Sequence, residues 1–267
     1  MSIINQSNLI FENLQSIGDV LNNVIGYSSI PVKVENSSNI IFRRMLVGGT
    51  THKILADNSR KILIEDCAFA FGHEGLTFNN TEVTLRNSTL VFGGVCQIRF
   101  RNLGRQKVVL ENNIITDMLL MKTMNALVMV DSIDDFTERN NCFFVRLPEN
   151  ERNIYGWNTK DGAPVQRASG ETSPRDPYVG RRQVTYERFV SENDRKATSF
   201  FANPGLGVMK NFLVTYPDLA TWKKKWKKDQ KKSWKESSVS REQRMDFKQY
   251  LPTDPEVIKR NCGPREK

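Results

Sequence analysis

Short runs of alternating hydrophobic and polar residues recur through the first half of the chain. Most runs contain two apolar residues separated by one position, then a charged residue, then Asn or a residue that replaces it. The ends of consecutive runs are separated by 31, 22, 21, 25 and 28 residues and lie at Asn13, Arg44, Asp66, Asn87, Asn112 and Asn140. A second set of runs ends at Asn58, Asn80 and Asn102, which are 22 residues apart. Short strands with this period, separated by Asn and Gly turns, predict a solenoid in which each repeat is one coil.

The two Asn columns are expected to form side-chain ladders. In a parallel stack of coils, equivalent residues lie about 4.8 Å apart, so each amide can hydrogen-bond to the next coil. Asn also adopts the left-handed backbone conformation that tight turns require. Chance repetition in a β-sandwich is the alternative, but it would not keep two columns in the same register.

These ladders and their register resemble the right-handed parallel β-helix of the pectate-lyase-like superfamily. The resemblance covers roughly residues 7–147. It implies an all-β fold of about six coils with three strands in each coil. It implies no particular activity, because the superfamily includes lyases, glycoside hydrolases, epimerases and non-catalytic scaffolds.

The basic excess of the chain lies entirely in its C-terminal part. Residues 1–160 carry 16 basic and 16 acidic side chains, whereas residues 161–267 carry 23 and 14. Turn-forming residues dominate from Asp161 to Pro177, which indicates a loop. We therefore expect a β-helix over residues 1–150, a linker over 151–180 and a basic, partly helical C-terminal extension packed on the β-helix over 181–267.

The densest positive charge lies in residues 218–235, which contain eight lysines and three tryptophans. Leu219, Trp222 and Trp226 follow helical spacing, so this segment is predicted to be an amphipathic basic helix. One interpretation is that its tryptophan face packs on the β-helix. The other is that lysine and tryptophan together bind nucleic acid or an anionic surface. The absence of Arg from this segment disfavours specific phosphate recognition.

Two other C-terminal segments, residues 200–204 and 246–255, resemble the closing segments that follow many bacterial β-helices. The resemblance implies that the tail runs back along the coils. Such a tail would cover an outward column of the first set of strands that is largely apolar, formed by Ile10, Ile41, Leu63, Thr84, Val109 and Thr137. A partner subunit is the alternative cover for this column.

The charged position of the first set alternates in sign from coil to coil. Its members are Glu12, Arg43, Glu65, Arg86, Glu111 and Arg139. A stripe that binds saccharide is one interpretation of this column. We favour a ladder of ion pairs between neighbouring strands, because the local net charge is zero.

The second set of strands carries the candidate site. Inward apolar residues leave Asp57, Asn79 and Arg101 in one outward column, with Arg99 beside it. A polar face of this kind is suited to hydroxyl and carboxylate groups of a glycan. We therefore predict that Asp57, Asn79, Arg99, Arg101 and His52 bind substrate.

One acidic residue beside this face is the candidate for catalysis. His52 and Glu74 occupy equivalent positions before consecutive strands, and His73 adjoins Glu74. Enzymes that cleave glycans need an acid or base, or two carboxylates for hydrolysis. We predict Glu74 and His73 as the catalytic pair if the protein is an enzyme.

No cofactor or metal site is predicted. The four cysteines, Cys67, Cys96, Cys142 and Cys262, show no CxxC spacing, which argues against zinc and a disulfide framework and favours buried free thiols. The acidic group from Asp131 to Asp135 is interpreted as a solvated turn rather than a Ca²⁺ site. The chain also lacks the motifs of a phosphate-binding loop, of α/β-hydrolases and of zinc proteases.

Location and assembly are left open by the sequence. No apolar run approaches the roughly 20 residues that span a bilayer, and the N-terminal residues lack the features of a secretory signal. An extracellular or cell-surface location would fit a piece of a larger protein. Because the first coil begins without a preceding cap, we expect a larger parent protein or a homo-oligomer.

Three functions remain open from the sequence. The first is a carbohydrate-associated protein that acts on or binds an acidic polysaccharide, as a lyase or hydrolase if it is an enzyme. The second is a non-catalytic structural or glycan-binding scaffold. The third is a binder of nucleic acid or an anionic surface through the lysine-rich segment.

Overall fold

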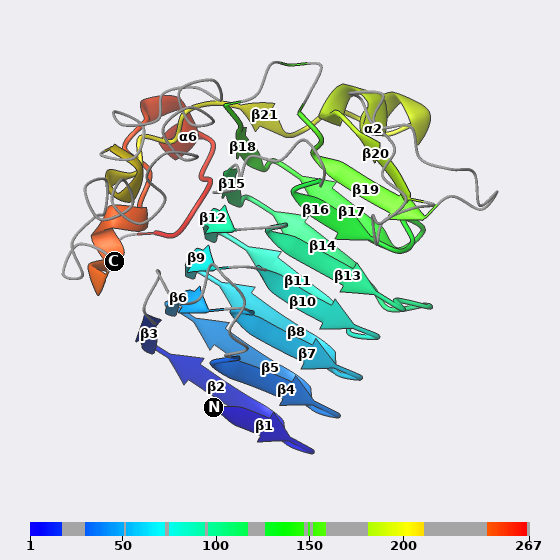
Figure 1. Cartoon of the computed structure of the whole chain (residues 1–267), viewed down its shortest axis with the longest axis vertical. Helices are drawn as coiled ribbons and strands as arrows, with labels where there is room; N and C mark the ends of the chain where they lie inside the picture. Colours follow the sequence, from blue (N-terminus) through cyan, green and yellow to red (C-terminus); the bar gives the residue numbers. More distant parts are fainter. Residues whose placement is uncertain are drawn as a thin grey trace, which may run out of the picture.

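Three β-sheets, parallel except for the last strand of sheet A, form the sides of a β-solenoid (Figure 1). The computed structural model describes residues 1–17, 30–50, 52–72, 75–93, 96–116, 126–146, 149, 152–158, 181–210 and 245–265. Sheet A contains β1 (Ser2–Ile4), β4 (Val32–Glu35), β7 (Ile54–Asp57), β10 (Leu76–Asn79), β13 (Ile98–Arg101), β16 (Val128–Val130), β19 (Tyr155–Asn158) and β20 (Arg181–Val184). Sheet B contains β2 (Ser7–Glu12), β5 (Ser38–Arg43), β8 (Arg60–Glu65), β11 (Val83–Arg86), β14 (Val108–Glu111) and β17 (Phe136–Arg139). Sheet C contains β3 (Gln15–Ile17), β6 (Leu46–Thr50), β9 (Ala68–Gly72), β12 (Thr89–Gly93), β15 (Ile114–Thr116), β18 (Cys142–Phe144) and β21 (Phe200–Phe201).

The prediction of a parallel solenoid is confirmed, but the number of regular coils is smaller than the six expected. Strands β4, β7, β10 and β13 start at Val32, Ile54, Leu76 and Ile98, so about four turns follow the 22-residue repeat. Strands β1–β3 and β16–β18 lie in the same sheets but follow longer intervals. Counting coils by the turn asparagines gave six, because the coils at both ends also contribute strands to the three sheets. Those end coils do not keep the 22-residue repeat.

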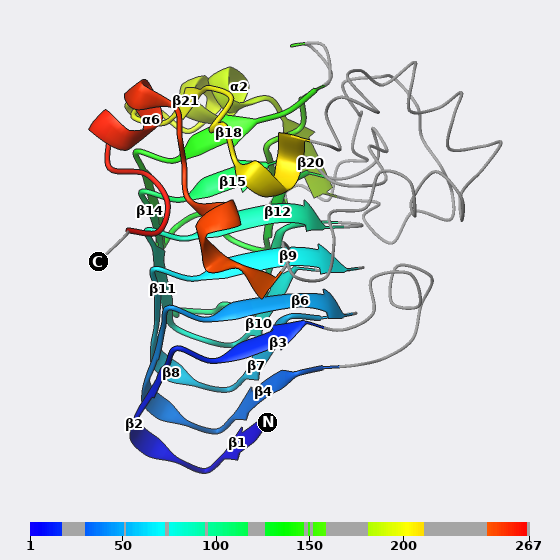
Figure 2. The same ribbon diagram turned by 90° about the vertical axis from the view of Figure 1, so that its left-hand side faces the viewer.

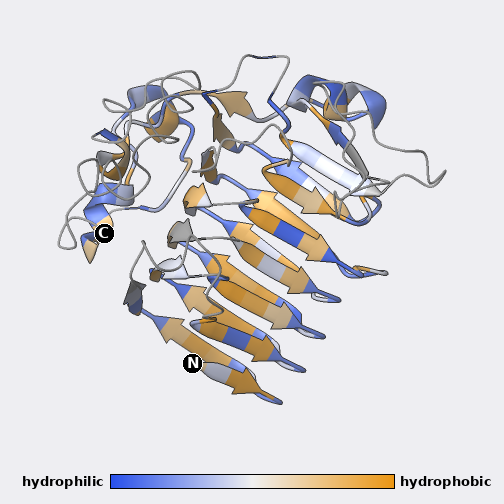
Figure 3. Ribbon diagram, viewed as in Figure 1, coloured by the Kyte–Doolittle hydropathy of each residue, from blue (hydrophilic) through white to orange (hydrophobic). Residues whose placement is uncertain are grey.

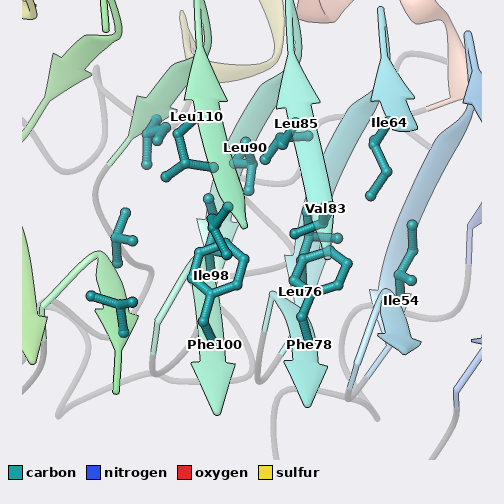
Figure 4. Close-up of a cluster of buried hydrophobic side chains, with 14 of the residues drawn as sticks. Ile54, Ile64, Leu76, Phe78, Val83, Leu85, Leu90, Ile98, Phe100 and Leu110 are labelled. Carbon is teal, nitrogen blue, oxygen red and sulfur yellow. The ribbon is translucent and has the colours of Figure 1, made fainter. Parts of the chain in front are cut away.

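The core lies between the three sheets. Alternate residues of each strand point inward, and the resulting apolar columns are almost completely buried (Figure 4). Identical side chains stack in neighbouring coils, as Phe78 and Phe100 do with ring centroids 5.4 Å apart. This packing uses the β-branched, leucine and phenylalanine positions that the repeat pattern identified.

The Asn ladders are present on the outside of the turns. Asn58, Asn80 and Asn102 all have positive φ, and the Asn80 Nδ2 group donates to Asn58 Oδ1 at 2.9 Å. In the other column, Asn140 Nδ2 donates to Asn112 Oδ1 at 2.8 Å. Both columns therefore supply left-handed turn residues and hydrogen bonds between coils.

A second ladder, buried at the corner between sheets B and C, connects the coils more extensively. Its members are the fully buried residues Cys67, Ser88, Asn113 and Asn141. Asn113 Oδ1 accepts the Ser88 N–H at 3.1 Å, and Asn141 Oδ1 accepts the Asn113 N–H at 3.0 Å. Asn113 Nδ2 also donates to the Leu85 carbonyl at 2.9 Å. Each side chain therefore satisfies backbone groups of the neighbouring coil.

The corner between sheets A and B has a ladder of hydroxyl groups. Ser59 Oγ accepts the Ser37 N–H at 3.1 Å and Thr81 Oγ1 accepts the Ser59 N–H at 3.3 Å. The same hydroxyls donate to carbonyls two residues earlier, at Asp57 and Asn79. Buried backbone groups at both corners thus have partners, as a stable interior requires.

The C-terminal tail packs on sheet C (Figure 2). Strand β21 extends that sheet by pairing with β18, and Thr89 Oγ1 donates to the Tyr250 carbonyl at 3.0 Å. The 3₁₀-helix η2 (Phe247–Tyr250) and helix α6 (Pro255–Lys259) contribute buried Tyr250 and Val257 to the same apolar cluster. Gly263, at φ +84°, lets the chain approach Ile114 so closely that a Cβ would lie 2.5 Å from its Cδ1 atom.

The tail therefore runs back along the coils as expected, but against a different sheet from the one predicted. The expected target was the apolar outward column of sheet B, where Ile10 is 61% exposed and Ile41, Leu63 and Val109 are half-buried. Sheet C has a more continuous apolar outer face, which includes Leu46, Val91 and Phe92. The predicted lysine-rich helix at 218–235 lies outside the described residues, so the basic helical extension is not confirmed.

The end of the solenoid after β18 is covered by helix α2 (Tyr186–Glu192). Phe189 of this helix stacks on Tyr155 with centroids 4.2 Å apart, and Tyr186 donates to Glu138 Oε1 at 2.9 Å. Burial raises the pKa of the Glu138 carboxyl.

Sheet A continues past residue 150 through β19 and the antiparallel strand β20. Residues 159–180, most of the predicted linker, lie outside the described residues. Within the described ranges, no helix is long and apolar enough to cross a bilayer.

Replacement of Asn113 by Ala is expected to destabilise the fold strongly. It leaves the buried Ser88 N–H and Leu85 carbonyl without their partners, and each unsatisfied group costs about 1–3 kcal/mol. Urea unfolding should show a loss of at least about 2 kcal/mol. The control is Asn203→Ala, which removes an exposed side chain that accepts the N–H of Gly205, two residues along the chain. Equal stabilities for the two variants would contradict a structural role for the buried ladder.

Candidate functional site

The outward face of sheet A brings most of the predicted binding residues together. Thr77 of β10 lies opposite Leu55 of β7 and Arg99 of β13, and Asn79 lies opposite Asp57 and Arg101. These parallel pairs form two outward columns that lie side by side. Within each column, residues of neighbouring strands are about 4.8 Å apart. We call this group the sheet A patch; it consists of His52, Asp57, Thr77, Asn79, Arg99 and Arg101.

Exposure divides the patch into two parts. Arg101 is exposed and Asp57 and Asn79 are half-buried, whereas Thr77 and Arg99 are 4% and 3% exposed. His52 is half-buried, and its Nδ1 atom lies 3.3 Å from Thr77 Oγ1. The histidine therefore lies between the two parts. The patch therefore offers donors and acceptors at its surface and a buried guanidinium beside them.

The exposed part of the patch is fixed by hydrogen bonds to the following turn. Asn102 Nδ2 donates to Asn79 Oδ1 at 2.7 Å, and the Asn102 N–H donates to Asp131 Oδ2 at 2.7 Å. On the neighbouring coil, Lys33 Nζ and Glu35 Oε2 form an ion pair at 2.7 Å. The hydrogen bond that Lys33 donates to Glu35 raises the pKa of Lys33. These contacts hold the outward side chains in defined positions.

The corner where each coil enters sheet A contains polar residues that the sequence pattern did not identify. Lys53 and Gln97 are fully buried there, and Gln97 Nε2 donates to the Thr116 carbonyl at 3.0 Å. Gly75 stands between them in the column, and a Cβ at Gly75 would lie 1.6 Å from the Gln97 carbonyl oxygen. The sequence could have revealed this column, because positions 53, 75 and 97 are 22 residues apart, as the turn asparagines are.

The predicted catalytic pair is not tested by the structure. Glu74 and His73 both lie outside the described residues, whereas His52, Asp57, Asn79, Arg99 and Arg101 are all placed on or beside sheet A. The substrate-binding prediction thus concerns residues that the fold brings together. Their binding of a substrate remains a prediction.

The alternating charges of sheet B form ion pairs. Glu65 accepts hydrogen bonds from Arg43 Nε at 2.7 Å and from Arg86 Nε at 2.9 Å. Arg139 pairs with Glu111 at 2.7 Å, and Arg43 Nη1 lies 3.7 Å from Glu12 Oε1. Burial by itself would raise the pKa of Glu65, but the hydrogen bonds and charges of Arg86 and Arg43 lower it below its ordinary value. The charges of this sheet thus have a structural role, in agreement with the ion-pair interpretation.

Free thiols are buried and no metal cluster is present in the described part of the chain. All four cysteines are free and buried. Burial raises the pKa of Cys67, Cys142 and Cys262 to about 12. The described residues contain no group of three or more His, Cys, Asp or Glu side chains that could hold a metal ion.

Comparison with family models, with curated proteins and with solved structures gives no match to this chain.

Glu65→Gln is expected to destabilise the protein at pH 7 and to weaken the pH dependence of its stability. The lowered pKa of Glu65 means that its contribution is present above the unfolded-state pKa of about 4.3 and is lost as the pH falls through the folded-state value. Urea unfolding at pH 7 should show a loss of roughly 1.5–3 kcal/mol, the range for hydrogen bonds to charged groups. The difference from wild type should shrink at pH 3.

The control for this test is Glu256→Gln. Glu256 pairs with Arg260 across one helical turn on an exposed surface, where solvent screening leaves such a pair little effect on stability. If the Glu65 and Glu256 variants have the same free energy of unfolding at pH 7, the sheet B ion pairs do not stabilise the fold.

The native protein is expected to resist thiol reagents. With pKa values of about 12, the three shifted thiols have a thiolate fraction on the order of one in ten thousand at pH 8, and all four are shielded from solvent. Titration with a chromogenic disulfide should detect almost no thiol in the native state and four in guanidinium. Rapid labelling of the native protein would contradict this burial.

Proposed function

We propose that this protein binds an acidic oligosaccharide along the outward face of sheet A. The observation that carries the proposal is that the outer faces of the three sheets make different contacts. The charges of sheet B pair with one another, and the outer face of sheet C packs against the C-terminal tail. On sheet A, Asp57, Asn79 and Arg101 form an outward polar column, and Thr77 and Arg99 lie in the adjacent column.

The chemistry of the sheet A patch suits a uronate-containing chain. Arg99 and Arg101 are two residues apart on β13 and lie on the same face. A guanidinium can bind a carboxylate through two parallel hydrogen bonds, which a hydroxyl group alone does not offer. The half-buried Asn79 and Asp57 add donors and acceptors for sugar hydroxyls on the neighbouring strands. The regular spacing between strands supports binding of a repetitive polymer rather than a compact metabolite.

Catalysis and superfamily membership are finer parts of the proposal. Glu74 with His73 would act as acid or base next to the bound sugar, and a right-handed, pectate-lyase-like β-helix would be the corresponding scaffold. The parallel solenoid and the outward polar columns support these assignments. A lyase would generate an unsaturated uronate that absorbs ultraviolet light, whereas a binding protein would not.

A second candidate function is a non-catalytic structural scaffold. It is favoured by the extent to which the described residues satisfy one another at both corners, in the sheet B ion pairs and under the tail. The scaffold requires no ligand on sheet A. Binding measurements therefore separate the two candidates.

Titration with oligogalacturonate, a sulfated oligosaccharide and a neutral oligosaccharide, each at low and high salt, tests the proposal. The uronate oligomer should raise the melting temperature and give saturable binding by calorimetry that persists at high salt. Arg101→Gln should weaken this binding by a factor of at least about ten, because it removes a charge-assisted hydrogen-bonding group.

The matched control is Arg60→Gln, which removes an exposed arginine from the start of β8 on sheet B. It should bind the uronate oligomer as wild type does. Absence of binding to every glycan would favour the scaffold. A stabilisation by all polyanions, nucleic acid included, that disappears with salt would favour non-specific binding by the basic segment.

A further inference from the structure

Exposed hydrophobic side chains gather at the end of the solenoid formed by the first coil. Six large hydrophobic residues of the described chain are exposed, and four belong to this coil: Met1, Ile4, Ile10 and Leu14. Ile10 is the most exposed of the six, at 61%. Figure 3 shows that the strands at this end, β1 and β2, are largely hydrophobic. An apolar group of this kind on one end of a molecule indicates an interaction surface.

Among the described residues, no strand pairs with the outer edges of the strands at this end. Strands β1, β2 and β3 are the terminal strands of sheets A, B and C. Native edge strands are usually protected by charges, proline or bulges. Within these three strands Glu12 is the single charged residue, and it is already paired with Arg44. The three edges can therefore accept strands from another chain without charge repulsion.

The opposite end of the solenoid is closed. Sheet A ends there with the antiparallel strand β20, and Phe189 and Tyr186 of α2 pack on the aromatic residues of the last coils, including Tyr155 and Phe143. The open end cannot stack on this closed end as a further parallel coil. The surface that can match three open strand edges is the same surface on a second copy.

We propose that two copies of this chain associate through their first coils about a two-fold axis that passes by Ile10. A two-fold axis reverses the strand direction, so β2 would pair with β2 of the second copy in antiparallel fashion. Residues directly opposite in such a pair lie on the same face of the sheet. With Ile10 opposite Ile10, Leu9 lies opposite Phe11, and Asn8 opposite Glu12.

This register gives the apolar side chains on both faces of the sheet a contact across the interface. Leu9 and Phe11 pack against the core of their own coil, so their pairing would extend the core across the interface. The two Ile10 side chains would cover each other on the outside. From strand lengths and sheet spacing, the end face buries on the order of 600 Å² per copy, which reaches the lower range of specific dimers.

Sedimentation of wild type, Ile10→Lys and Ile258→Lys across the micromolar range tests the association. Ile258 is a matched control, because it is 53% exposed on α6 at a distance in sequence and fold from the first coil. Wild type and Ile258→Lys should sediment as dimers of the 30.7 kDa chain. Ile10→Lys should associate at least about tenfold more weakly. Monomeric wild type, or equal association of all three proteins, would overturn the proposal.

A cross-linking experiment tests the register independently of stability. Opposed residues in an antiparallel pair have Cα atoms about 4.5–5.5 Å apart, within the range of a disulfide. Ile10→Cys should therefore form a covalent dimer under mild oxidation, whereas Ile258→Cys should not. The native cysteines do not interfere because all four are buried. Equal cross-linking of the two variants, or none at Ile10→Cys, would overturn the two-fold axis proposed here.

Discussion

Buried side chains at the corners of the solenoid, each accepting an N–H group of the neighbouring coil, fix the register on which the other features depend. Ser88, Asn113 and Asn141 do this between sheets B and C. Parallel strands alone tolerate a shift along the chain, and a shift of one residue would move every inward side chain to the outer face. Since the ladder side chains bind at one position in each coil, they select a single alignment for all three sheets.

The common register gives each sheet a separate outer surface. On sheet B it places Glu65 between Arg43 and Arg86, so that the charges stabilise the stack. On sheet C it creates an apolar surface that the tail covers through Tyr250 and Val257. On sheet A it aligns arginine with threonine and asparagine in adjacent strands. The proposed glycan site is thus a consequence of stacking rather than of any single loop.

The sequence predicted features that depend on local conformation and repeat length. Asn58, Asn80 and Asn102 marked the turns because few other residues adopt positive φ readily, and period-two alternation placed Asp57, Asn79 and Arg101 on one face. The buried ladder was missed because its positions are occupied by Cys67, Ser88 and Asn113, which differ in chemistry but accept the same kind of N–H group. The tail's target was missed because contacts such as Thr89 to Tyr250 join residues 161 positions apart. Burial of Lys53 likewise depends on tertiary packing that no local pattern encodes.

Hydrogen exchange of the corner amides tests the role of the ladders most directly. The N–H groups of Cys67, Ser88 and Asn113 lie between strands and donate to side chains of the next coil. If these contacts fix the register, their amides should exchange as slowly as the central strands, through global unfolding alone. Exchange within seconds to minutes, while the strands stay protected, would show that the sheets hold the stack without the ladders.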